Sequence, residues 1–208
     1  MQGALVCSMT NNTQTVGTDG VYRITITCHQ HKPLLQITAG FDFVYKWFDY
    51  LGGYGHCIAG YVIMPDHVDA IIGFRNIGST ISGIVAEGKR MIGSDILRRL
   101  RDSRELEVLG SIAMEMSFEG SFRCDGSELW QDSFTWKHCR SNSFIDQQLD
   151  AMHRKPGSRR WNLARDDWDY THSSAAFYQL GFSSSYPVFD YRQLRSIDLS
   201  RLNFQHWW

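Results

Sequence analysis

The 208-residue sequence has no long hydrophobic run, only four prolines and almost no net charge. None of its apolar segments approaches the roughly 20 residues that a membrane-spanning helix requires. The N-terminus lacks the basic stretch followed by an apolar one that marks a secretory signal. These absences argue against a membrane partner, and we expect a soluble, cytoplasmic protein with one main domain.

The five cysteines are an odd number and show no Cys-x-x-Cys spacing, which favours reduced thiols over a disulfide framework or a zinc knuckle. A formal net charge of -1 excludes a protein that coats nucleic acid through charge alone. Any such binding must therefore depend on local basic groups. The first group comprises Lys89, Arg90, Arg98, Arg99, Arg101 and Arg104, and the second comprises Arg154, Lys155, Arg159 and Arg160. Both also fit solvated helix faces, although a loop position after a helix favours function for the second group.

Hydrophobic periodicity predicts the secondary structure of the first half of the chain. Residues 21–28 alternate and are rich in β-branched side chains, which is typical of a strand. Residues 41–51 have apolar side chains at helical spacing and end at Gly52-Gly53, a helix stop. The apolar segments on either side of Pro65-Asp66 predict a β-hairpin, and residues 77–100 predict a long helix.

The second half of the chain is less regular. Residues 102–128 have no steady period, so we expect an insertion that could hold a β-hairpin. Residues 129–131 open a short strand or turn, and residues 143–153 predict a helix that Pro156-Gly157 ends. This order predicts an α+β fold, a ferredoxin-like antiparallel sheet with helices on one face. We expect a weakly ordered lead-in over residues 1–19, the main domain over 20–157, and an aromatic-rich C-terminal extension over 158–208 that packs on it.

His67 and Asp69 alternate along the second strand of the predicted hairpin. Because side chains two residues apart share one face of a strand, an imidazole and a carboxylate can converge on one cation there. His29 and His31 have the same spacing, but they follow a strand and flank a polar residue, which favours a loop with two surface histidines.

Several segments, in order, resemble the HUH single-strand DNA transposases, in particular the REP-associated tyrosine transposase branch. They are Pro33-Leu34-Leu35, Tyr61-Val62-Ile63-Met64-Pro65-Asp66-His67-Val68-Asp69, Leu129-Trp130-Gln131 with Phe134, Leu149-Asp150-Ala151-Met152-His153-Arg154-Lys155-Pro156, Trp161-Asn162-Leu163-Ala164 and Tyr170-Thr171-His172-Ser173-Ser174-Ala175. The resemblance extends from about residue 21 to residue 194.

In that family, two histidines on the hairpin strand and a polar residue on a later helix bind a divalent cation, and a tyrosine on that helix attacks the phosphodiester. The resemblance places these roles at His67, Asp69, Lys155 and Ala151, in that order. Only His67 matches. Asp69 would still suit Mg or Mn, but Ala151 has no oxygen with which to attack. The resemblance therefore implies lost nicking activity and no cofactor, with a divalent cation at His67 and Asp69 only if the protein is active.

Lys155 and Asp69 suggest a replacement for that cation. Residues four apart share a helix face, so Lys155 can face the hairpin strand if Ala151 does. We hypothesise that the Lys155 ammonium forms an ion pair with Asp69 in the place of the metal. The alternative is that Lys155 points to solvent.

The resemblance implies hairpin or single-stranded DNA as the partner, and a homodimer is compatible with the sequence. The residues expected to contact DNA are Lys89, Arg90, Arg154, Arg159, Arg160 and Trp130, the last as a stacking platform or else as a core residue. Two alternatives stay open. One is an active transposase or nickase whose nucleophile is Tyr170 or Tyr178, and the other is an interaction subunit that binds no DNA.

Overall fold

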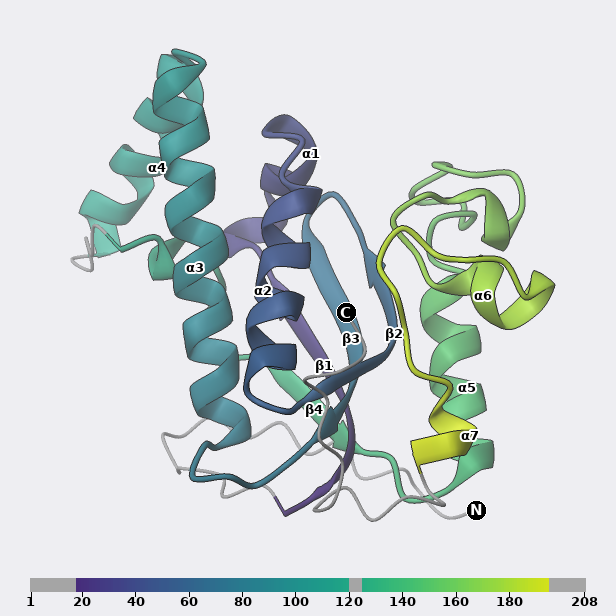
Figure 1. Cartoon of the computed structure of the whole chain (residues 1–208). Helices are drawn as coiled ribbons and strands as arrows, with labels where there is room; N and C mark the ends of the chain where they lie inside the picture. The colour runs from purple at the N-terminus through teal and green to yellow at the C-terminus, as the bar shows by residue number, and fades with distance from the viewer. Residues whose placement is uncertain (1–17, 120–124, 195–208) are drawn as a thin grey trace, which may run out of the picture.

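A four-stranded antiparallel sheet forms the centre of the computed structural model, which describes residues 18–119 and 125–194 (Figure 1). Its strands are β1 (Gly20–Thr27), β2 (Cys57–Ile63), β3 (His67–Phe74) and β4 (Thr135–His138), in the spatial order β2-β3-β1-β4. Each neighbouring pair is antiparallel. This order is that of a ferredoxin-like fold, in which helices connect β1 to β2 and β3 to β4. The predicted α+β class and topology are confirmed.

Helices cover both faces of the sheet (Figure 1). The two long helices α2 (Phe41–Gly53) and α3 (Ile81–Asp102) share one face, as expected. α5 (Asn142–His153) lies on the opposite face, so the expectation of helices on one face holds only for α2 and α3. The shorter elements are η1 (His29–His31), α1 (Leu34–Ile37), α4 (Leu106–Glu119), η2 (Ser127–Leu129), η3 (Asp167–Asp169), α6 (Ala175–Leu180) and α7 (Tyr191–Leu194).

The strands divide their side chains between two cores with the period of two that a pleated sheet imposes. Ile24 of β1 and Ala70 of β3 belong to the larger core, which packs under α2 and α3. Val62 and Ile71 face the other way and pack against Leu149 of α5 and its neighbours. His67 and Asp69 lie four and two residues before Ile71 on β3, so their side chains share its face of the sheet and point toward α5.

Local signals fix the two helices that frame this arrangement. The Ser141 hydroxyl accepts a hydrogen bond from the Phe144 amide at 3.2 Å and caps the start of α5. Thr80 caps α3 in the same way through the Gly83 amide at 2.9 Å. A side chain at Gly93 of α3 would place its Cβ 2.0 Å from the Gly126 carbonyl oxygen, so only glycine allows the chain to pass this close to α3.

One prediction for residues 102–138 was wrong, and one open alternative is decided. Residues 106–119 form α4 rather than a β-hairpin, because Val108, Leu109 and Ile112 lie at helical spacing and pack against the larger core. Of the strand or turn expected to open at residues 129–131, the structure has the turn: Leu129 ends η2, Trp130 forms only an isolated bridge with Cys28, and the edge strand β4 begins at Thr135.

The C-terminal extension contacts the sheet along the free edge of β2. The Ile63 amide donates to the His172 carbonyl at 2.9 Å, and Ser173 forms an isolated antiparallel bridge with Val62. The Tyr186 amide donates to the Tyr61 hydroxyl at 2.9 Å. The expected lead-in falls almost wholly outside the described residues, as does the end of the extension. Within the described ranges no helix is long and apolar enough to cross a membrane.

A candidate site around the buried Asp69 carboxylate

Asp69 is fully buried on β3, and its carboxylate is held by donors from β1. The antiparallel register places Thr25 directly opposite Asp69, and the Thr25 hydroxyl donates to Oδ1. Arg23, two residues earlier on the same face, donates from Nη2 to Oδ2 at 2.9 Å. Arg23 also donates from Nη1 to the Gln148 side-chain oxygen of α5 at 2.9 Å. The sheet and α5 are therefore linked through one guanidinium.

The Lys155 ammonium completes the carboxylate's partners. Nζ lies 2.5 Å from Oδ2 of Asp69 and 2.8 Å from Nε2 of His67. Lys155 follows the C-terminal end of α5 and its side chain is 30% exposed, so the ammonium reaches in from the surface. The hypothesised ion pair between Lys155 and Asp69 is confirmed, and the alternative of a solvent-directed lysine is excluded.

The electrostatic balance keeps Asp69 ionised. Burial raises the pKa of this carboxyl, but the Arg23 guanidinium and the Lys155 ammonium outweigh burial and lower the pKa below its usual value. Two cations therefore surround one carboxylate, which leaves the cluster with a surplus positive charge.

His67 is oriented by a second carboxylate. An ammonium can only donate, so Nε2 of His67 accepts from Lys155 and its Nδ1 carries the proton that is donated to Asp66. Asp66 also bonds Nδ1 of His31 at 2.9 Å, and the Arg160 guanidinium lies 3.7 Å away. His31 is exposed, as expected of a surface histidine, and it also helps to hold the turn that precedes β3.

The residues at this position do not fit a divalent cation. The two candidate ligand atoms are Nε2 of His67 and Oδ2 of Asp69, and the Lys155 ammonium already contacts both. A fixed positive charge at this distance repels a metal ion. Within the described residues, no group of three or more His, Cys, Asp or Glu side chains is arranged to hold a metal. Lys155 is therefore the residue that makes His67 and Asp69 unsuited to a metal ion.

The position expected for a nucleophile holds no reactive group. Ala151 is exposed on α5, and its methyl side chain has no oxygen or sulfur. The face of α5 that meets the sheet instead presents Gln148 and Met152, both buried. Lys155 reaches the site because it lies three residues beyond Met152, just past the helix end.

Tyr170 and Tyr178, the alternative nucleophiles, are engaged in packing. The Tyr170 hydroxyl donates to the Ile63 carbonyl at 2.8 Å, and burial raises its pKa to about 12. The Tyr178 hydroxyl donates to the Ala59 carbonyl, and burial raises its pKa as well. A raised pKa disfavours the phenolate that attack requires. The geometry gives both residues a structural explanation.

The second basic group lies around the site. Arg154, Arg159 and Arg160 are exposed and flank Lys155 at the end of α5. The Arg154 guanidinium contacts Asp150 at 3.3 Å, an exposed pair within the helix. The Arg160 guanidinium lies 5.0 Å from the ring centroid of Trp161, whose ring is in turn 6.1 Å from that of His67. An aromatic ring and several cations therefore border the Asp69 cluster.

The first basic group is largely occupied within the protein. Lys89 is buried and donates to the Gln131 and Asp132 carbonyls at 2.5 and 3.2 Å. Trp130 is 2% exposed and donates to the Lys89 carbonyl at 2.9 Å. The expectation that Lys89 and Trp130 contact nucleic acid does not fit this burial, because neither side chain can reach a ligand. Arg90 is exposed on α3 and pairs with Glu87.

Arg23, Thr25, Gln148 and Asp66 were not expected from the sequence to take part in the site. Arg23 and Thr25 alternate along β1, so they share a face, but only the pairing with β3 places that face beside Asp69. The alternation of side chains along β1 could be read from the sequence, but the register of β1 against β3 could not. Asp66 was recognised only as part of a turn.

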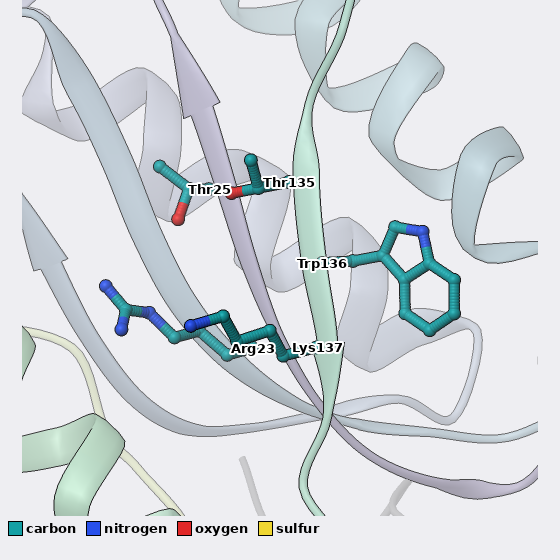
Figure 2. A pocket seen from close by; sticks show the side chains of 5 residues that line it. All are labelled: Arg23, Thr25, Thr135, Trp136 and Lys137. Carbon is teal, nitrogen blue, oxygen red and sulfur yellow. The ribbon is translucent and has the colours of Figure 1, made fainter. Parts of the chain in front are cut away.

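A pocket of about 220 Å³ adjoins the cluster on the part of the same sheet face formed by β1 and β4 (Figure 2). It is lined by Arg23, Thr25, Thr135, Trp136 and Lys137. Thr135 pairs with Thr25 and Lys137 pairs with Arg23 across β1 and β4, so these four side chains share the face. Figure 2 shows the Trp136 ring on the other side of β4.

Comparison with known proteins places the fold among transposases. No protein-family model matches the sequence. No curated protein matches it either. A solved structure of a REP-associated tyrosine transposase bound to a REP hairpin is similar over 88% of this chain and 93% of its own, with a TM-score of 0.56 and 12% identity. A Deinococcus radiodurans protein assigned as a transposase gives a TM-score of 0.38 at 15% identity, over 69% of this chain and 98% of its own. At this identity the first likeness shows the fold alone: the chain has the fold of a tyrosine transposase.

Proposed function

We propose that this protein is a transposase-like DNA-binding protein of the HUH type that recognises hairpin or single-stranded DNA and has lost strand nicking. The observation that carries the proposal is the Lys155 ammonium, which lies between His67 and Asp69 where the family holds a metal. Ala151 on the adjacent helix supplies no nucleophile. Both chemical requirements for cleavage are therefore replaced, while the fold is kept.

Surface charge supports DNA binding by a protein whose net charge is close to zero. Arg154, Arg159 and Arg160 project from one end of α5, beside the partly exposed Lys155. Basic side chains grouped in this way neutralise consecutive phosphates. The structurally similar transposase was solved with a REP hairpin, which makes a DNA hairpin the first ligand to test.

A gel-shift assay separates the candidate functions. The protein is incubated with an imperfect DNA hairpin or with a random single strand, each with EDTA and with Mg²⁺. We expect retention of the hairpin that does not depend on the metal. No binding of either DNA would support an interaction subunit, and binding that requires Mg²⁺ would support an active metal enzyme.

A cleavage assay tests the loss of nicking. With Mn²⁺ and hairpin DNA carrying a single-stranded extension, we expect no covalent protein–DNA adduct on a denaturing gel. An adduct that Tyr170→Phe or Tyr178→Phe abolishes would establish the alternative nucleophile. The triple change Ala151→Tyr, Asp69→His, Lys155→Asn tests whether the loss is confined to these positions, because it returns every expected reactive group at once.

A further inference from the structure

We infer that the pocket on the face of the paired strands β1 and β4 binds a phosphodiester of single-stranded DNA without a metal ion. Lys137, Arg23 and Lys155 supply the positive charge. This inference rests on the proposed function and assigns a place on the protein to the single strand beside a hairpin. It departs from metal-dependent phosphate binding, since it gives the cation's role to side chains of this chain.

The pocket has the chemistry of an anion site. Its five lining residues include two cations and no acid, and the Thr135 hydroxyl adds a donor, while Thr25 already donates its hydroxyl proton to Asp69. Lys137, Thr135 and Trp136 are exposed on the edge strand β4, so a ligand can reach them from solvent. Figure 2 shows the Arg23 and Lys137 side chains on the same side of the two strands. Hydroxyl and ammonium donors of this kind recognise phosphate oxygens.

The pocket continues into the Asp69 cluster. Arg23 and Thr25 line the pocket and also donate to the Asp69 carboxylate. The same carboxylate oxygen, Oδ2, accepts from Arg23 and from Lys155. Arg23 and Lys155 carry two positive charges and Asp69 one negative charge, so one positive charge is in excess, and Lys137 adds another. Phosphate binding therefore needs no added cation.

Lys155 has a donor to spare. An ammonium group has three N–H bonds, and those to Asp69 and His67 use two of them. The side chain is 30% exposed, so the third can face a ligand at the surface. A single strand that crosses from Lys155 to Lys137 would follow the open part of the sheet, which α5 leaves uncovered.

The test measures how much a single-stranded extension adds to hairpin affinity. Fluorescence anisotropy compares a DNA hairpin with the same hairpin carrying an oligothymidine extension, in EDTA and in Mg²⁺. We expect the extension to strengthen binding by the same factor in both buffers. We expect Lys137→Gln to reduce that gain about fivefold or more at low salt. The slope of the logarithm of the binding constant against the logarithm of the salt concentration should fall by about 0.7, the value for one phosphate of a single strand.

Controls make the outcomes distinct. Lys46→Gln makes the same charge change on α2, across the sheet, and should keep the full gain. Lys155→Gln should reduce the gain further, with folding checked by circular dichroism. The inference is overturned, while the proposed function stands, if the hairpin is bound but the extension adds no affinity. The same holds if the gain from the extension appears only with Mg²⁺, or if Lys137→Gln leaves that gain unchanged. If neither DNA is bound, the proposed function itself fails.

Discussion

The two basic groups of this chain look alike in the sequence and differ in the structure. Four of the six residues in the group on and after α3 are buried or paired: Lys89 donates to backbone carbonyls, Arg90 and Arg98 pair with acids of the same helix, and Arg99 forms a two-pronged ion pair with Asp42 at 3.0 and 2.9 Å. The group at the end of α5 keeps Arg159 and Arg160 exposed beside the Asp69 cluster. Charge density along a sequence therefore does not show which cations a ligand can reach, because partners from distant segments decide it.

The strongest test of this difference is DNA affinity. We expect hairpin binding to weaken about 100-fold at low salt in a triple variant that combines Arg154→Gln, Arg159→Gln and Arg160→Gln, because about three phosphate contacts are lost. The matched triple Arg90→Gln, Arg98→Gln, Arg101→Gln removes the same charge from α3 and should change affinity less than about threefold. Anisotropy titrations over a range of salt measure both. Equal losses would show that only total charge matters.

Lys155 should also contribute to stability, unlike an exposed lysine. Lys155→Met leaves the buried Asp69 with Arg23 as its remaining cation, and we expect a loss of about 2 kcal/mol in the free energy of unfolding at pH 7. Lys46→Met, which removes an exposed ion pair with Asp95, should cost less than about 0.5 kcal/mol. Urea unfolding followed by circular dichroism gives both values.

The pH dependence of the Lys155 effect follows from Asp69. Its folded pKa is lowered, so below the unfolded pKa of about 3.9 the unfolded state binds more protons than the folded state. The stabilisation is present above that pH and is lost as the pH falls through the lowered folded pKa. The difference between wild type and Lys155→Met should therefore shrink in acid. A difference that stayed constant would mean that the ion pair is not its source.

Lys89 should affect stability and leave DNA binding unchanged. Lys89→Met removes donors to two carbonyls at a cost of about 1 kcal/mol at pH 7. Burial lowers the folded pKa of Lys89 to about 8, whereas the unfolded value is about 10.4. Between these values the unfolded state binds the extra proton, so this group's contribution to stability rises with pH. The deficit of the variant in urea unfolding should grow from pH 8 to pH 10, and unaltered hairpin affinity would confirm the structural role.

The smallest effects on stability are expected for Arg99 and Arg98. Its ion pair with Asp42 is partly exposed, and its guanidinium lies 3.9 Å from the Phe43 ring centroid. Arg99→Met should cost about 0.5 to 1 kcal/mol of stability, and Arg98→Met less than that. Hairpin affinity should be the same for both variants. A DNA-binding defect in either would place part of the DNA surface on α3.

Much of the fold could be predicted because its signals are local. Alternation defined β1, glycines ended α2, and a Pro-Asp turn marked the hairpin before His67. The ion pair of Lys155 with Asp69 was expected from a strand parity that holds and from a helix position that does not, because Ala151 is exposed and Lys155 lies past the end of α5. In contrast, Arg23 and Thr25 entered the site through the register of β1 against β3, which no local pattern records.

The misplaced elements have a related cause. α4 contributes Val108, Leu109 and Ile112 to the larger core, and its mixed composition hid a helical spacing that packing reinforces. Trp130 and Lys89 are buried because residues 126–132, which include η2, pass over α3: Gly126 meets Gly93, and Trp130 donates to the Lys89 carbonyl. Burial of this kind depends on which distant segments touch.

The carboxylate oxygen that Arg23 and Lys155 share also limits how a metal site could be engineered here. Asp69→His alone would set an imidazole between two cations with no counter-charge. Lys155→Asn alone would leave Asp69 paired with Arg23. A stepwise design therefore has to remove the lysine before it replaces the carboxylate.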